Sequence, residues 1–166
     1  MCGIFGEFGL TTTNNKIFKK ILELSKNRGP DMVGYYSGSN IQFGFNRLSI
    51  LDTSAEANQP IFSPSGRYVI MCNGEIVNYL DIKSLCGISD NQLRSKSDTE
   101  VLSHALDKWG IYRMLSSIRG MYAIAIFDLK KNCLDLIRDP AGIKPLYTAK
   151  TDQGWIFASQ YNQIFK

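Results

Sequence analysis

The amino-acid sequence predicts an α+β protein in which stacked β-sheets are covered by helices. Two runs, 68–72 and 121–129, are apolar at both odd and even positions, which is typical of strands with both faces covered. Helical spacing of apolar residues follows Asn14 and Ser97. Because two-faced strands need a layer on each side, we expect the sheets to pack against one another and against these helices.

The first elements expected are a strand, a helix and a second strand. A short apolar run over 3–8 predicts the first strand. Asn14 or Asn15 can cap the helix, and Gly29 with Pro30 should end it. The apolar face of this helix consists of Ile17, Phe18, Ile21, Leu22 and Leu24. Residues 41–48 alternate apolar and polar side chains, which predicts a half-buried strand with Arg47 at its end.

A second helix is expected to begin at a capping box formed by Ser97 and Glu100. Its apolar residues are Val101, Leu102, Ala105, Leu106 and Trp109. Gly110 should end it, and the capping box places Asp98 at its N-terminus. Further strands are expected over 134–137, 145–149 and 155–158.

Length and composition fit one domain covering residues 1–166. Hydrophobic residues make up 44% and charged residues 20% of the chain, as in soluble globular proteins. The net charge of +4 comes from scattered basic residues, so we expect no nucleic-acid partner. No signal sequence and no apolar run of about 18 residues is present, so we expect a cytoplasmic protein without a membrane partner.

The cysteines suggest one reactive position and no metal site. No CxxC pair occurs, and His104 is the one histidine in the sequence, so metal binding is not expected. Cys72, Cys86 and Cys133 stand in apolar surroundings and are expected to be buried. Cys2 differs because it would become the N-terminal residue once Met1 is removed.

A cysteine nucleophile needs a base, because little thiolate exists near neutral pH at the ordinary pKa of about 8.5. His104 is expected in mid-helix, where a packing or surface role is the more natural one. The α-amino group of Cys2 is the alternative, since its pKa of about 7.7 to 8.0 suits proton transfer. Position 2 alone leaves open a purely structural cysteine near the start of a strand.

Other candidate residues also have plain structural interpretations. Asn73 and Gly74 could donate a side-chain amide and a backbone N–H to an oxyanion, but Asn-Gly equally favours a tight hairpin turn. Arg47 could bind a carboxylate, and Glu75 with Asp98 could bind an ammonium group, or each could be a surface charge. Together they offer one group for each charged end of a free amino acid.

These residues belong to motifs that resemble those of class II glutamine amidotransferases, above all the N-terminal domain of asparagine synthetases. The motifs are Met1-Cys2-Gly3-Ile4-Phe5-Gly6, Arg28-Gly29-Pro30-Asp31, Arg47-Leu48-Ser49-Ile50, Asn73-Gly74-Glu75-Ile76, Ser97-Asp98-Thr99-Glu100, Arg119-Gly120-Met121, Arg138-Asp139 and Gly142-Ile143-Lys144-Pro145-Leu146-Tyr147. They extend over almost the whole chain, in the order found in that family.

The resemblance implies an N-terminal-nucleophile hydrolase fold, a four-layer αββα sandwich of two mainly antiparallel sheets. It implies that Cys2 is the nucleophile and that the Asn73 side chain and the Gly74 N–H form the oxyanion hole. It also implies that Arg47 binds the α-carboxylate of glutamine. Glu75 and Asp98 would then bind its α-ammonium group, with the backbone of Leu48 and Ile50 lining the pocket. No cofactor or metal is implied for this domain.

The function implied is hydrolysis of glutamine to glutamate and ammonia through a thioester. The sequence contains no Ser-Gly-Gly-x-Asp-Ser loop for ATP, so ATP and magnesium are expected only in a separate synthetase part. We expect the ammonia to pass to a synthetase domain or subunit, with the chain being a cut-out domain or a stand-alone subunit; a homodimer is also compatible. Two alternatives remain: an N-terminal-cysteine hydrolase of another amide, and a catalytically silent binding or regulatory module.

Overall fold

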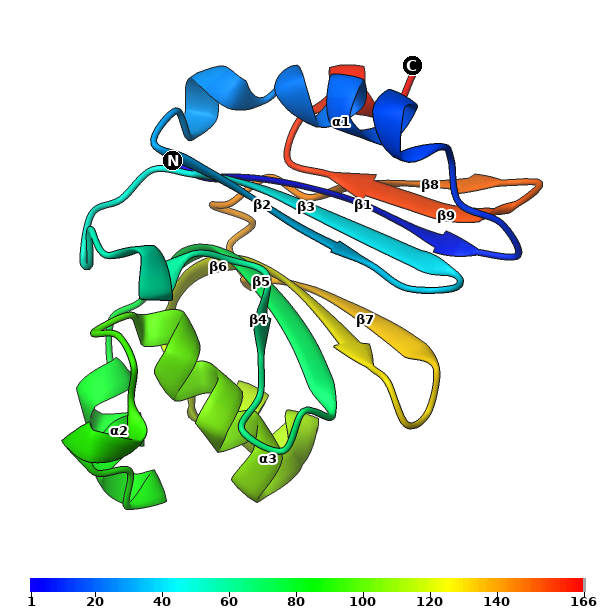
Figure 1. The fold of residues 1–166 in the computed structure, drawn as a ribbon. Helices are drawn as coiled ribbons and strands as arrows, with labels where there is room; N and C mark the ends of the chain where they lie inside the picture. The colour runs from blue at the N-terminus through cyan, green and yellow to red at the C-terminus, as the bar shows by residue number, and fades with distance from the viewer. Residues whose placement is uncertain (166) are drawn as a thin grey trace.

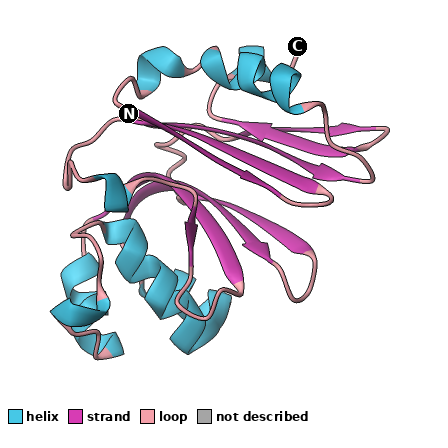
Figure 2. Cartoon of the chain, in the orientation of Figure 1, coloured by secondary structure: helices cyan, strands magenta, loops and turns pink. Residues whose placement is uncertain are grey.

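The computed structural model, which describes residues 1–165, contains two antiparallel β-sheets stacked face to face (Figure 1). One helix packs on the outer face of the first sheet, and two helices pack on the outer face of the second sheet, as the cartoon of Figure 2 shows. This αββα order of layers confirms the four-layer sandwich predicted from the sequence.

The first sheet has five strands in the order β2-β3-β1-β9-β8. Their bounds are β1 Gly3–Gly9, β2 Met32–Ser37, β3 Ile41–Arg47, β8 Tyr147–Thr151 and β9 Gly154–Ala158. The covering helix is α1, Asn15–Glu23, and the side chain of Asn14 caps it by accepting a hydrogen bond from Lys16 N. Thus β1, which follows Cys2 directly, is an inner strand of this sheet.

The second sheet has four strands in the order β4-β5-β6-β7. Their bounds are β4 Ile61–Phe62, β5 Tyr68–Ile76, β6 Gly120–Asp128 and β7 Cys133–Arg138. The covering helices are α2, Tyr79–Cys86, and α3, Asp98–Ser117. Single 3-10 turns lie at Lys26–Arg28, Ala55–Ala57, Asp90–Gln92 and Tyr161–Gln163.

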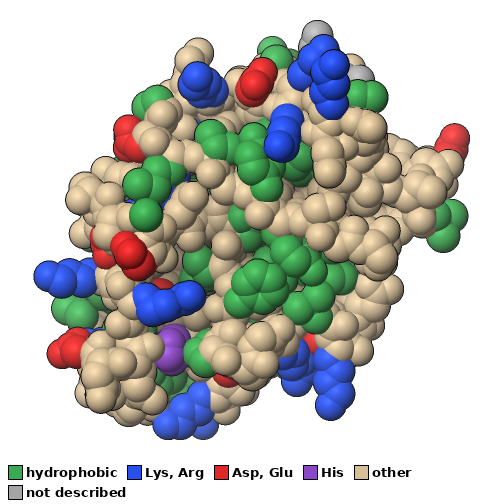
Figure 3. Space-filling model, viewed as in Figure 1, with side chains coloured by type: hydrophobic (Ala, Val, Ile, Leu, Met, Phe, Trp, Pro, Cys, Tyr) green, Lys and Arg blue, Asp and Glu red, His purple; other side chains and the backbone are tan. Residues whose placement is uncertain are grey.

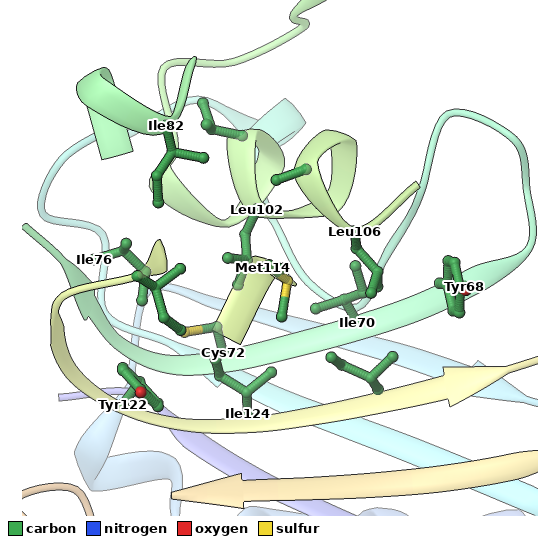
Figure 4. Close-up of a cluster of buried hydrophobic side chains, with 14 of the residues drawn as sticks. Tyr68, Ile70, Cys72, Ile76, Ile82, Leu102, Leu106, Met114, Tyr122 and Ile124 are labelled. Atoms are coloured by element: carbon green, nitrogen blue, oxygen red, sulfur yellow. The ribbon is translucent and has the colours of Figure 1, made fainter. Parts of the chain in front are cut away.

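Three clusters of buried apolar side chains hold the four layers together. Phe5 and Ala158 pack against Phe18 and Leu22 between the first sheet and α1. The cluster between the sheets contains Ile4, Ile41, Phe43, Phe45, Val69, Met71, Ala123, Ala125, Phe127 and Phe157. The third joins the second sheet to α2 and α3, with Leu102, Leu106 and Met114 facing Ile70, Cys72 and Ile124 (Figure 4).

The prediction that residues 41–48 form a half-buried strand was wrong in its burial, because every residue of β3 is buried. Its polar side chains bond to other parts of the protein instead of to water: Gln42 donates to Thr13 O in the loop before α1, and Asn46 donates to the end of α1. Gly44 leaves room for the helix, since a β-carbon there would lie 2.7 Å from a methyl group of Leu22. The amide of Asn46 donates hydrogen bonds to Leu22 O (2.8 Å) and Ser25 Oγ (2.9 Å). The polar side chain is thus satisfied inside the protein.

Other predicted boundaries also differ. The first helix ends at Glu23, before Gly29 and Pro30, and a 3-10 turn over Lys26–Arg28 lies between the helix and those two residues. Gly110 interrupts α3 with a positive φ of 74°, but helical residues continue to Ser117. The capping box is half formed: Ser97 Oγ accepts from Glu100 N, while the Glu100 carboxylate accepts from the backbone N–H groups of residues 94 and 95.

Strand β2 and helix α2 were not predicted, and the expected burial of Cys133 was wrong. Cys133 is exposed at the start of β7, whereas Cys72 and Cys86 are buried as expected. Within residues 1–165, no helix has the length and apolar character required to span a bilayer. Figure 3 shows basic and acidic side chains dispersed over one face, without a single basic patch on it.

Candidate active site

A cavity of about 200 Å³ lies where the start of β1 and the end of β3 meet β5 and the N-terminus of α3. Its lining includes all eight residues singled out from the sequence: Cys2, Arg47, Leu48, Ile50, Asn73, Gly74, Glu75 and Asp98. A larger neighbouring cavity of about 820 Å³ contains none of them. The structure therefore brings together, in one enclosure, residues that are as far as 96 positions apart in the chain.

Cys2 lines this cavity and lies directly before β1. Its Sγ accepts a hydrogen bond from Leu48 N at 3.4 Å and lies 3.7 Å from Leu48 O. Its backbone carbonyl accepts from Arg28 Nε at 2.9 Å, which holds the N-terminal segment. Burial raises the pKa of the Cys2 thiol, while the hydrogen bond from Leu48 and the N-terminal charge oppose the increase. The thiol is therefore protonated near neutral pH and would need a base to act as a nucleophile.

Arg47 is buried at the end of β3, with its guanidinium directed into the following segment. Nη1 donates to Ser54 O at 2.7 Å, and Nη2 donates to Asp52 O. Both acceptors are backbone carbonyls, and Arg47 takes part in no ion pair within residues 1–165. The guanidinium is thus fixed in orientation, and no carboxylate of the described residues forms an ion pair with it.

Asp98 is buried at the first position of α3. Its Oδ2 accepts from Ile76 N at 2.8 Å, and its Oδ1 accepts from Thr99 N at 2.8 Å. Burial raises the pKa of Asp98, these hydrogen bonds oppose the increase, and the nearby Glu75 carboxylate adds to it. Glu75 is exposed beside it. A cation in the cavity would favour the ionised form of Asp98.

Asn73 and Gly74 lie inside β5 and pair with Ala123 and Tyr122 of β6, so the hairpin-turn interpretation of Asn-Gly was wrong. The Asn73 side chain is buried, and its Nδ2 donates a long hydrogen bond of 3.5 Å to Ser159 Oγ. A β-carbon on Gly74 would lie 2.3 Å from Met121 O, so only glycine fits this close approach of the two strands.

Several lining residues were not singled out as candidates from the sequence. Gln59 is buried, accepts from Cys72 N at 2.6 Å, and donates to Thr99 Oγ1 at 3.2 Å. No local pattern marks it, because its partners come from two distant elements. Lys144 belongs to a motif noted above and is buried against the same cavity.

His104, the conventional candidate base, does not line the cavity and is half-buried in α3. Within the described residues 1–165, no group of three or more His, Cys, Asp or Glu side chains could hold a metal ion. The expectation of no metal or cofactor stays a prediction. The chemistry available at the cavity is that of a thiol, amide and backbone donors, and charged side chains of both signs.

Comparisons with known proteins fit this arrangement. The model of the glutamine amidotransferase domain family matches residues 1–166. A glutamine-hydrolysing asparagine synthetase 2 of Bacillus subtilis is 36% identical over 99% of this chain, and asparagine synthetase B of Escherichia coli is 35% identical over 96% of it. The chain spans 22% and 29% of the length of these two relatives.

A solved structure of glutamine phosphoribosylpyrophosphate amidotransferase from B. subtilis has the same fold, with a TM-score of 0.81. The match covers 99% of this chain and 43% of the chain in the solved structure, and 20% of the aligned residues are identical. The likeness therefore supports the layered architecture, and the family assignment rests on the match along the whole sequence. The chain belongs to the glutamine amidotransferase domain family.

Proposed function

We propose that this chain is a glutaminase unit that hydrolyses the side-chain amide of glutamine to glutamate and ammonia. The observation that carries the proposal is the shared cavity, which combines a thiol, oxyanion donors and groups for both charged ends of an amino acid. Its volume of about 200 Å³ lies below the roughly 300 to 1,000 Å³ of pockets for drug-sized ligands. The size suits a single amino acid.

Recognition of the substrate begins with two buried charges. Arg47 would bind the α-carboxylate, and Asp98 with Glu75 would bind the α-ammonium group. Neither Arg47 nor Asp98 has an ion-pair partner within residues 1–165. Because unpaired buried charges are costly, a zwitterionic ligand that supplies both opposite charges is favoured. The backbone of Leu48 and Ile50 would line the space between them.

Attack requires that Met1 be removed, which frees the α-amino group of Cys2 to act as the base. While Met1 is attached, the nitrogen of Cys2 is a peptide N–H and cannot take up a proton. The raised pKa of the Cys2 thiol makes such a base necessary. His104 lies outside the cavity lining, which favours the amine over a Cys-His pair.

The reaction then takes two steps. The sulfur of Cys2 attacks the side-chain amide carbon, and the oxyanion accepts hydrogen bonds from the Asn73 amide and the Gly74 N–H. The C–N bond breaks as the amine of Cys2 passes the thiol proton to the leaving nitrogen, which releases ammonia and forms a γ-glutamyl thioester. Water, deprotonated by the same amine, attacks the thioester, and glutamate leaves as the thiol is restored.

The ammonia would pass to an acceptor on another domain or chain. The two relatives carry the name of glutamine-hydrolysing asparagine synthetases, and this chain matches less than a third of their length. We therefore infer that residues 1–166 form the glutaminase domain and work with an ammonia-accepting synthetase domain or subunit, in the cytoplasm. ATP and magnesium would act there, without a cofactor in the cavity described here.

Two other functions predict different outcomes. A hydrolase of other amides would not require both charged ends of the substrate, whereas the buried Arg47 and Asp98 favour a substrate that carries both. A silent module would not react with a glutamine-like electrophile. Comparing glutamine with acyl amides that lack the α-amino and α-carboxylate groups separates the first alternative from the proposal.

The deciding experiment is intact-protein mass spectrometry before and after incubation with 6-diazo-5-oxo-norleucine, followed by peptide mapping. The expected result is loss of Met1 and one adduct on Cys2, blocked by excess glutamine. Cys2→Ala is the control and should form no adduct. A wild-type protein that has lost Met1 yet forms no adduct and releases no ammonia would overturn the proposal in favour of a silent module.

A further inference from the structure

Arg47 depends on the segment that follows β3. Its two terminal nitrogens donate to the backbone carbonyls of Asp52 and Ser54, so the direction of the guanidinium follows the path of the chain over 52–54. Carbonyl oxygens fix a guanidinium without neutralising it, which leaves the charge available for a carboxylate. A change in the conformation of this segment would therefore move the group that binds the α-carboxylate.

The side chain of Asp52 holds the same segment at two points. Its Oδ1 accepts from Ser54 N at 2.7 Å, which closes a local turn. Its Oδ2 accepts from Lys96 N at 2.6 Å, across 44 positions of sequence. Hydrogen bonds from Ser54, followed by that from Lys96, lower the pKa of Asp52 to about 2, so the carboxylate is ionised at working pH.

Lys96 lies two residues before Asp98, at the entrance to α3. The intervening Ser97 caps that helix by accepting from Glu100 N at 3.1 Å. The backbone carbonyl of Asp52 therefore contacts Arg47. The side chain of Asp52 contacts Lys96, in the segment that leads to Asp98. Arg47 and Asp98 provide the two charged sides of the amino-acid cavity, and Asp52 also lines that cavity.

We propose that Asp52 is a positioning residue that sets the spacing between Arg47 and Asp98, and so makes the cavity selective for an amino acid with both charged ends. The inference rests on the proposed glutaminase function. Asp52 acts through its neighbours: its carboxylate oxygens are occupied by Ser54 N and Lys96 N rather than directed at the ligand.

The test compares wild-type protein with Asp52→Ala and Asp52→Asn. We expect Asp52→Ala to lower kcat/KM for glutamine up to about 100-fold, mainly through KM, as for a binding group displaced by about 1 Å. Asp52→Asn keeps one acceptor oxygen, so its kcat/KM for glutamine should fall less than that of Asp52→Ala. Asp90→Asn is the matched control, because Asp90 is an exposed carboxylate that pairs with Lys83 outside the cavity lining, and it should behave as wild type.

Two further readouts separate positioning from general damage. The first is alkylation of Cys2 by iodoacetamide, which needs neither charged group and should keep its rate. The second is discrimination against glutaramic acid, which lacks the ammonium group, and 4-aminobutanamide, which lacks the carboxylate. Wild-type protein should prefer glutamine over both strongly, and Asp52→Ala should lose much of that preference.

An unchanged KM and an unchanged preference in Asp52→Ala would overturn the inference. A parallel fall of the iodoacetamide rate would do the same, because it would mean that the whole site had collapsed. If Asp52→Ala does not fold, Asp52→Asn is judged by the same criteria. Wild-type protein that turns over no glutamine would refute the proposed function itself, which distinguishes that failure from the failure of the role of Asp52.

Discussion

Replacing Asn73 with alanine should slow glutamine hydrolysis while leaving the fold intact. The side chain is buried at the cavity, yet its amide nitrogen makes only a long hydrogen bond of 3.5 Å to Ser159 Oγ within residues 1–165. A hydrogen bond at this upper limit of donor–acceptor distance contributes little to the stability of the fold. The amide is thus available to an oxyanion and is not needed to hold β5 in place.

The two costs of the substitution can be compared. Loss of one oxyanion donor raises the barrier by about 2.7 to 4 kcal/mol, which is roughly 100- to 1,000-fold in kcat. Loss of an ordinary intramolecular hydrogen bond lowers the free energy of unfolding by about 0.5 to 1.5 kcal/mol, and this long one lies at the low end. Asn73→Ala should therefore raise the activation barrier by more than it lowers the free energy of unfolding.

The assay is ammonia release at saturating glutamine, together with the urea midpoint of unfolding. Ser159→Ala is the informative control, because Ser159 Oγ accepts from Ile4 N at 3.0 Å as well as from Asn73. It should lower the free energy of unfolding by about 1 to 3 kcal/mol, since it leaves a buried N–H unpaired, and should keep most of the turnover. Asn73→Ala with wild-type kcat, or with no more loss than Ser159→Ala, would refute the reasoning.

Three further predictions test the fold around the site. Gly74→Ala would place a β-carbon 2.3 Å from Met121 O, and the overpacking should lower the free energy of unfolding by about 1 to 3 kcal/mol in urea denaturation. Asn46→Ala removes the 2.8 Å hydrogen bond to Leu22 O and should lower the same quantity by about 0.5 to 1.5 kcal/mol. The pKa of Asp52 is lowered to about 2, below its unfolded value of about 3.9. Its contribution to stability is therefore present above pH 4 and lost toward pH 2. The urea midpoint of Asp52→Asn should therefore depend less on pH over that interval than the midpoint of the wild-type protein.

The roles of the site residues were implied by the resemblance of their motifs to a known family, whereas local signals predicted only where some of these residues lie. Asp98 follows a helix-capping serine, and Arg47 ends a strand with clear alternation. Cys2 precedes the first apolar run. Such signals depend on neighbours in sequence, so they place a residue at the end of an element without knowledge of the rest of the fold.

Other features depend on tertiary contacts and were missed or wrong. Asn73 and Gly74 favour a turn locally, but continuous pairing with β6 keeps them in a strand. Glu100 has the spacing of a capping box, yet its carboxylate accepts from two N–H groups of the preceding loop. Gln59 and Asp52 bind backbone groups from distant segments, and no local pattern identifies such partners.

The arrangement of the cavity links the core between the sheets to the proposed catalysis. The first sheet supplies Cys2 and Arg47, while β5 of the second sheet supplies Asn73 and Gly74. In the proposed reaction, the carbonyl of glutamine would contact the sulfur beside the first sheet and the proposed oxyanion donors in the second sheet. The distance between these groups is therefore set by how the two sheets pack, and that packing depends on the side chains between them, such as Phe43 against its neighbours. If the proposed reaction is correct, side chains outside the cavity lining thus set its geometry.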